Sequence, residues 1–290
     1  MSKFNLVRWD MLAAAVLLLI GIVHLPIQYL SRQLWEDPIS FRKPILFGIS
    51  TGVTLASLLL LLDELRPRRL DTWLRAVLCS TLTLEVFLIT IQPWRGEGSH
   101  FNRSGPLNAT IEFAMLVLIL TAVLIIAYLA LRSAFPGAFR PIPVARVAGH
   151  RWGMFFLLVS CALGIWITIE GSAQLARGGD PGLMGDRGVL KFPHGATLHA
   201  IQTLVIWAWI CDWIGSRYAW HSVTWLAASH LLLLIYSMRQ TLLGRGRWEM
   251  DAIGVGLFTG IALAGLLAIG LALWSQKLGS PRGGEDAAVR

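Results

Sequence analysis

The chain has 290 residues, of which 55% are hydrophobic and only 14% are charged, and its mean hydropathy is +0.62. This composition excludes an ordinary soluble globular protein, which is roughly 45–50% apolar and about 25% charged. The formal net charge of +8 fits loops that face anionic lipid, and no nucleic-acid-binding motif is present.

Apolar stretches along the chain approach the ~20 residues that a membrane-spanning helix needs. In chain order we expect eight spans, at residues 11–30, 45–62, 73–92, 109–131, 152–170, 193–214, 221–243 and 252–274. The first stretch lacks the small-x-small cleavage site of a signal peptide, so it is predicted to be a helix. The predicted fold is all-α, a polytopic transmembrane helical bundle that forms one domain over residues 1–276. The tail at 277–290 is predicted to be disordered and cytoplasmic.

An even number of spans places both termini on one side of the membrane. That side carries 14 of the 25 Lys and Arg residues, which predicts cytoplasmic termini in a bacterial inner membrane by the positive-inside rule. In the last span, Gly256 and Gly260 form a GxxxG motif, with Gly265 and Gly270 further along. These glycines predict a face that packs against another helix.

A weak internal repeat divides the chain near its middle. The residue pairs that recur 148 positions apart are Lys43 and Lys191, Gln92 and Gln240, Gly96 and Gly244, and Gly98 and Gly246. This shift predicts two tandem four-helix halves, 1–145 and 146–276, of the parallel kind found in transporters. Coincidence is the alternative, because the chain contains 28 glycines.

Polar side chains gather at span ends on the side opposite the termini. They include His24, Gln28, Lys43, Gln92, Glu112, Glu170, His194, His199, Gln202, Gln240 and Asp251. Polar groups at membrane depth normally face a bundle interior or a wet cavity, although residues at helix ends also snorkel to the interface. His24, Glu112, His199 and Gln202 lie a turn or more inside, so we expect them to line a buried site open to the extracytoplasmic side.

The histidines in this set predict a metal or haem site. The candidate metal ligands are His24, His100, His194 and His199; His24 and His199 are also candidates to hold haem b, with Gln202 and Arg95 as further cofactor contacts. Glu112 and Glu170 are the candidate acid–base residues or additional ligands. His194 and His199 point about 140° apart on one helix, so a haem or transition-metal site has to be assembled from several spans.

Two further polar features favour a different chemistry. Glu85 lies near the middle of its span, where a carboxyl either stays protonated or pairs with a cation, as a proton-coupled mechanism requires. Arg95 and Arg103 flank a glycine-rich loop that could bind an anionic group. His230, also near mid-span, is expected to be a core histidine.

Three blocks resemble a known group of proteins. They are KPILFGIS at 43–50, SHFN at 99–102 and FPHGATLHAIQ at 192–202. They resemble a group of bacterial polytopic membrane proteins for which no activity is assigned, and the resemblance extends from about the second span to the end of the seventh. It implies a bacterial origin and assigns no role to any residue.

Three functions fit the sequence. A haem- or metal-binding membrane redox protein ranks first, because a simple transport vestibule has no special need for imidazoles. A proton-coupled transporter of a small solute ranks second. A non-catalytic membrane scaffold, in which the polar residues lock helix packing, is the third. The expected partner is the lipid bilayer, with no nucleic acid.

Overall fold

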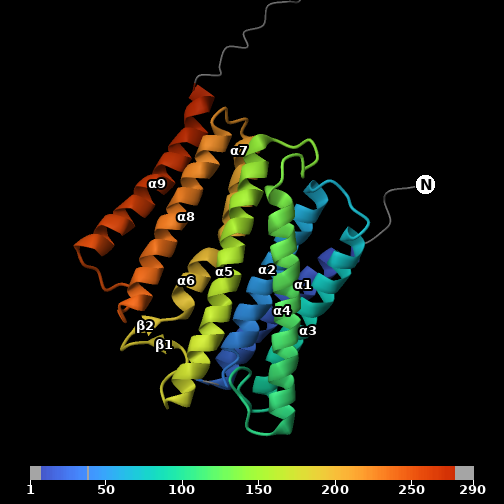
Figure 1. Cartoon of the computed structure of the whole chain (residues 1–290), viewed down its shortest axis with the longest axis vertical. Helices are drawn as coiled ribbons and strands as arrows, with labels where there is room; N and C mark the ends of the chain where they lie inside the picture. Colours follow the sequence, from blue (N-terminus) through green and yellow to red (C-terminus); the bar gives the residue numbers. More distant parts are fainter. Residues whose placement is uncertain (1–7, 38, 278–290) are drawn as a thin grey trace, which may run out of the picture. The chain divides into compact units, whose positions relative to one another are not determined.

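The computed structural model describes residues 8–37 and 39–277, and most of these residues are helical (Figure 1). The helices are α1 (Trp9–Ser31), α2 (Arg42–Glu64), α3 (Asp71–Trp94), α4 (Pro106–Ala134), α5 (Val144–Ala176), α6 (Lys191–Leu198), α7 (Ala200–Trp213), α8 (Ala219–Leu242) and α9 (Ala252–Lys277). A two-stranded antiparallel hairpin, β1 (Leu183–Met184) and β2 (Gly188–Val189), lies between the expected fifth and sixth spans. Except for Lys277, the predicted disordered tail lies outside the described residues.

Six of these helices, α1 to α5 and α9, are long and apolar enough to cross a membrane. The chain is therefore a multi-pass helical membrane protein, as its composition predicts. The structure does not confirm the count of eight spans. The expected sixth span is divided into α6 and α7, and α8 is long enough to cross a membrane but less apolar than the six.

The chain divides into two compact units. The first comprises Met1–Pro141 and Met154–Gly182, and the second comprises Ile142–Gly153 and Leu183–Arg290. The predictions of one domain over 1–276 and of two tandem halves stay predictions.

In the first unit, α1 and α2 pack closely because glycines line their contact. A Cβ added at Gly48 would lie 2.6 Å from the backbone nitrogen of Gly21, and one added at Gly52 would lie 3.0 Å from the carbonyl oxygen of Ala14. Small residues let helix backbones approach in this way in a membrane. The two helices therefore touch backbone to backbone at Gly21 and Gly48.

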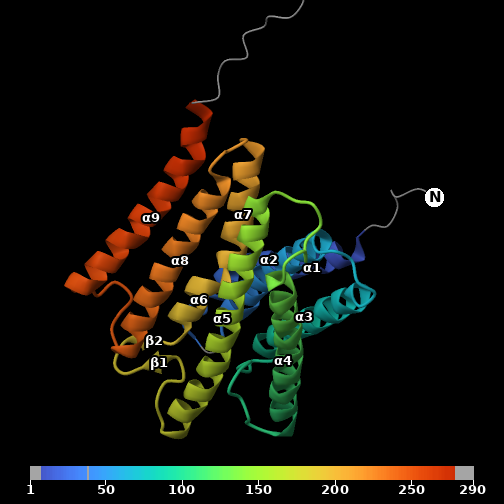
Figure 2. The same ribbon diagram turned by 45° about the horizontal axis from the view of Figure 1, so that its top comes forward.

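In the second unit, α8 and α9 run alongside each other, as Figure 1 and Figure 2 show. Two serines of α8 donate hydrogen bonds to carbonyls of α9: Ser222 Oγ to Ala268 at 2.6 Å and Ser229 Oγ to Ile261 at 2.9 Å. Gly260 lies against Leu232 of α8, but a Cβ at Gly256 would meet open space. The predicted glycine face is thus only partly used in this contact.

The ends of α3 and α8 have the same hydrogen-bonded cap. Gln92 Nε2 donates to the carbonyl of Gly98 at 3.3 Å, and Gln240 Nε2 donates to that of Gly246 at 3.2 Å. The backbone carbonyl of each glutamine also accepts a hydrogen bond from the backbone N–H five residues later. A glycine with positive φ makes both turns, Gly96 at 72° and Gly244 at 64°, as left-handed helix caps usually require. The residues that repeat in sequence therefore build the same local structure.

The cap of α8 continues into the start of α9 through Asp251. Its carboxylate accepts from Arg239 Nη2 and Arg245 Nη1, each at 2.6 Å, and from the backbone N–H of Gly254 at 2.8 Å. These bonds, led by the one from Arg239, hold the pKa of Asp251 well below its ordinary value. Because the shift is downward, its contribution to stability is complete above a pH of ~4 and is lost as the pH falls through the lower folded-state pKa.

Candidate functional site

His24 in α1 is buried, and both of its ring nitrogens form hydrogen bonds. Nδ1 donates to the carbonyl of Ile20 at 2.7 Å, and Nε2 accepts from Trp94 Nε1 at 3.1 Å. The ring also lies 5.8 Å from that of Phe41, which packs edge-on against Trp94. The imidazole therefore has no free lone pair in this arrangement, and its polar atoms tie the end of α3 to α1.

Arg95, another predicted site residue, is held by amide groups. Its Nη1 donates to Gln92 Oε1 at 2.5 Å and to Asn108 Oδ1 at 3.3 Å. Gln92 and Asn108 are both buried, and Asn108 in turn donates to Ser104 Oγ at 2.9 Å. This polar cluster closes the loop between α3 and α4.

The other site residues predicted in the first unit lie in separate contacts. His100 Nδ1 is 3.0 Å from Ser99 Oγ, and its ring lies 5.5 Å from that of Phe47. Glu112 pairs with the exposed Arg103 at 3.1 Å, and Glu170 accepts from Gln174 at 2.9 Å. The roles predicted for Glu112 and Glu170 as acid–base groups stay predictions.

In the second unit, the helix of the predicted sixth span breaks at His199. The helix α6 ends at Leu198, His199 has φ −91° and ψ 3°, and α7 begins at Ala200. This backbone conformation lies in the sparsely populated region where many active-site residues are found. The His199 side chain is exposed, whereas it was expected to line a buried site, and His194 and Gln202 are half-buried. The helical periodicity predicted neither the break nor this exposure.

Polar groups of α7 and α8 meet beside the break. Thr203 Oγ1 lies 2.9 Å from His230 Nε2, and its hydroxyl is also 3.3 Å from the carbonyl of His199. The other ring nitrogen of His230 contacts the carbonyl of Leu226 at 2.9 Å. His230 is thus hydrogen-bonded to a neighbouring helix, as expected for a core histidine, and Thr203 joins it to the break.

Within residues 8–37 and 39–277, no group of three or more His, Cys, Asp and Glu side chains could hold a metal ion. The predicted metal-binding histidines are divided between the two units, with His24 and His100 in the first and His194 and His199 in the second. The predicted metal or haem site therefore has no support from the described residues.

Glu85, near the middle of α3, is buried, with 4% of its surface exposed. Its Oε2 atom has no hydrogen-bond partner among the described residues. A carboxylate without a cation or donor is costly in such surroundings, whereas a protonated carboxyl is less so. These surroundings therefore favour the protonated, neutral form of the Glu85 carboxyl over the charged form.

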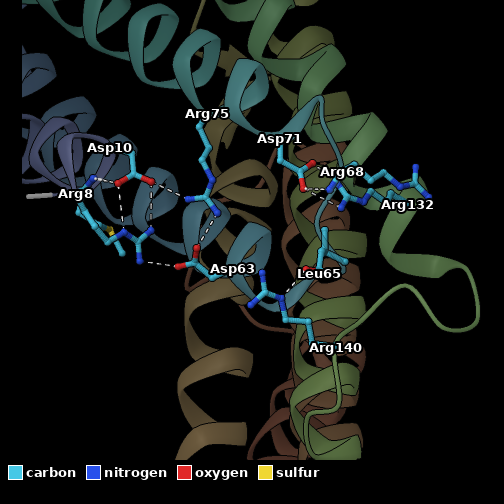
Figure 3. Close-up of polar contacts among 10 residues, drawn as sticks. Arg8, Asp10, Asp63, Leu65, Arg68, Asp71, Arg75, Arg132 and Arg140 are labelled. Atoms are coloured by element: carbon cyan, nitrogen blue, oxygen red, sulfur yellow. Dashed lines mark hydrogen bonds and ion pairs between the residues drawn. The ribbon is translucent and has the colours of Figure 1, made fainter. Parts of the chain in front are cut away.

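A ring of charged residues that was not predicted from the sequence lies at the other end of the first unit (Figure 3). Asp10 accepts from Arg75 Nη1 at 2.7 Å and pairs with Arg8 at 3.2 Å. Asp63 completes the ring, accepting from Arg8 and from Arg75 at 2.7 Å each. Two carboxylates and two guanidinium groups thus neutralise each other where α1 and α3 begin and α2 ends.

A second ion pair, visible beside this ring in Figure 3, holds the end of α4. Arg132, with 2% of its side chain exposed, pairs with Asp71 at the start of α3 and donates to the carbonyl of Arg66 at 2.5 Å. Asp71 also accepts from the backbone N–H of Arg68 at 2.8 Å. The sequence signal for both contacts is that Asp and Arg residues recur at consecutive span ends.

Comparison of the chain with protein-family models, with curated proteins and with solved structures found no match. The geometry described above therefore stands alone as the basis for function.

Proposed function

We propose that this protein is a proton-coupled membrane carrier for a small polar solute. The observation that carries the proposal is the helix break at His199, flanked by Thr203 and His230. Non-helical backbone at membrane depth is tolerated where it is buried in protein or lines a water-filled cavity. Discontinuous helices of this kind form the solute and ion sites of many carriers. We assign the solute site to this break.

Glu85 supplies the proton coupling in this proposal. A buried carboxyl in a membrane helix marks a proton pathway more often than a structural contact. Binding and release of a proton at Glu85 changes the charge inside the membrane and so biases the carrier between two conformations.

The matching caps of α3 and α8 support an origin from two tandem four-helix halves, an architecture common in carriers. The cap residues Gln92 and Gln240 occur in both halves, as a shared scaffold requires. The polar groups at membrane depth do not: Leu233 takes the place of Glu85, and Leu82 that of His230, at the 148-residue shift. Groups that the scaffold does not need are the better candidates for function.

The haem or metal redox protein is the second candidate. One observation favours it: the ring of His199 forms no hydrogen bond with any residue that the structure describes, so its nitrogens are available to a ligand. The arrangement at His24 does not fit an axial ligand, because both ring nitrogens are already used. We therefore derive no reaction step through a haem or metal.

The carrier can be tested in vesicles loaded with a pH-sensitive dye. We expect at least one class in a panel of amino acids, carboxylates, sugars and organic cations to change the internal pH when the wild-type protein is present. Glu85→Gln should abolish this proton movement, because an amide cannot bind the proton. Glu36→Gln, which alters an exposed carboxyl paired with Arg42, is the matched control and should retain it.

Two results would contradict the carrier. One is that no solute in the panel moves protons with a folded protein, and the other is that Glu85→Gln behaves as the wild type does. The same preparation also tests the second candidate. A Soret band or stoichiometric metal that disappears in His199→Ala would favour the redox protein instead.

A further inference from the structure

The second unit contains a cavity of about 230 Å³ beside the turn that joins α7 to α8. Its walls come from the start of α5, the end of α7 and the start of α8, and its polar lining includes Asp212 and Arg217. The volume is below the ~300–1,000 Å³ of pockets that enclose drug-sized ligands. It suits a compact charged group that enters from the exposed side.

The two charged groups of this cavity are poorly satisfied by the protein. Arg217 is exposed and makes no hydrogen bond or ion pair with any residue that the structure describes. Among the described residues, Asp212 has only a long ion pair, 3.8 Å from Arg146 Nη1, and the guanidinium of Arg146 stacks 4.2 Å above the ring of Trp209. One cation and one carboxylate therefore remain available to a ligand on the same surface.

Exposed tryptophans surround the cavity. Trp209 is 46% exposed, Trp213 is 86% exposed and Trp220, which lines the cavity, is 46% exposed. Indole rings concentrate where the hydrocarbon of a membrane meets its headgroups. The ends of α7 and α8 at the cavity thus lie at headgroup depth, where lipid is the most abundant ligand.

We infer that this cavity binds the phosphoethanolamine headgroup of a membrane lipid. The phosphate accepts hydrogen bonds from the guanidinium of Arg217, and the ammonium group donates to the carboxylate of Asp212. A glycerol headgroup carries the phosphate without the ammonium, so it brings a negative charge toward Asp212 and offers that carboxylate no cation beyond the long pair with Arg146. The site therefore discriminates a zwitterionic lipid from an anionic one, and it does not depend on the carrier function.

Native mass spectrometry of the full-length protein in mild detergent tests the inference. The probes are phosphatidylethanolamine, phosphatidylglycerol and free phosphoethanolamine. We expect phosphatidylethanolamine to bind more tightly than phosphatidylglycerol. Arg217→Gln should weaken phosphatidylethanolamine about tenfold, the effect of losing one charge-assisted hydrogen bond. Free phosphoethanolamine should bind weakly, because it lacks the acyl chains.

Asp212→Asn provides the sharper result, since a misfolded protein cannot reproduce it. This change should weaken phosphatidylethanolamine and strengthen phosphatidylglycerol, because it removes the repulsion of the phosphate. Arg69→Gln and Asp186→Asn, at exposed positions outside the cavity, are the matched controls and should change neither affinity. Equal binding of the two lipids to the wild type, or phosphatidylethanolamine binding that neither cavity variant weakens, would overturn the inference.

Discussion

Gly48→Ala is expected to weaken the first unit by about 1–3 kcal/mol, and Gly48→Leu by more, because these changes overpack the contact of α1 with α2. The added Cβ would lie 2.6 Å from the nitrogen and 2.8 Å from the Cα of Gly21, and 2.9 Å from the carbonyl oxygen of Leu17. These are backbone atoms, so no side chain can rotate away. The two helices must separate, which also loosens the buried side chains beside them.

The free energy of unfolding in mixed detergent micelles measures this effect. Gly256→Ala is the matched control, a glycine inside α9 where an added Cβ meets open space. It should leave stability unchanged or raise it by up to ~1 kcal/mol, since alanine is the better helix former. If Gly48→Ala were as stable as Gly256→Ala, the close packing of α1 on α2 would be wrong.

Asp71→Asn is expected to cost about 3–5 kcal/mol, because it leaves the guanidinium of Arg132 buried without a counter-charge. Only 2% of the Arg132 side chain is exposed, so water cannot replace the carboxylate. The loss should appear as a lower free energy of unfolding and as earlier proteolysis of the segment between α4 and α5, which the pair anchors.

Glu112→Gln is the control for this prediction. It removes the carboxylate from an ion pair with Arg103, whose side chain is 75% exposed, so the change should cost ~0–1 kcal/mol. Asp71→Asn and Glu112→Gln each remove one carboxylate charge, but the arginine left behind is buried in the first case and exposed in the second. Equal losses in the two variants would show that Arg132 is solvated and that the pair does not anchor α4.

Hydropathy predicts most of the helical elements, because a membrane helix requires a long apolar run whatever it packs against. The expected spans 73–92 and 109–131 lie within α3 and α4. Hydropathy did not predict that the expected sixth span is divided into α6 and α7. A one-residue break at His199 leaves composition and periodicity unchanged, because it depends on backbone geometry rather than on which residues are apolar.

The candidate site was harder to predict because its contacts join residues far apart in the chain. His24, a predicted ligand, accepts a hydrogen bond from Trp94, a residue on another helix that its own span does not reveal. The ring of Asp10, Asp63 and their arginines joins three helix ends, and each residue alone looks like an ordinary interfacial charge. Sequence periodicity predicts which face of a helix such a residue occupies. It does not predict which residue of another helix lies opposite.

The caps at Gln92 and Gln240 show the opposite case, in which a weak sequence signal coincides with real structure. Four matches among many glycines carried little statistical weight. The hydrogen bonds that the same residues make give the repeat a physical reason, since each glutamine closes a turn that its glycine permits. The proposal of two tandem halves rests on these bonds rather than on the count of matches.

If the helix break at His199 is the solute site of a carrier, we expect it to be reached in turn from both sides of the membrane. Accessibility of His199→Cys, in a chain whose Cys79, Cys161 and Cys211 are replaced by alanine, measures this directly. A membrane-impermeant maleimide should label the new thiol in both right-side-out and inside-out vesicles, whereas Trp213→Cys, at the far end of α7, should be labelled in only one. Labelling of His199→Cys in a single vesicle orientation would contradict the carrier.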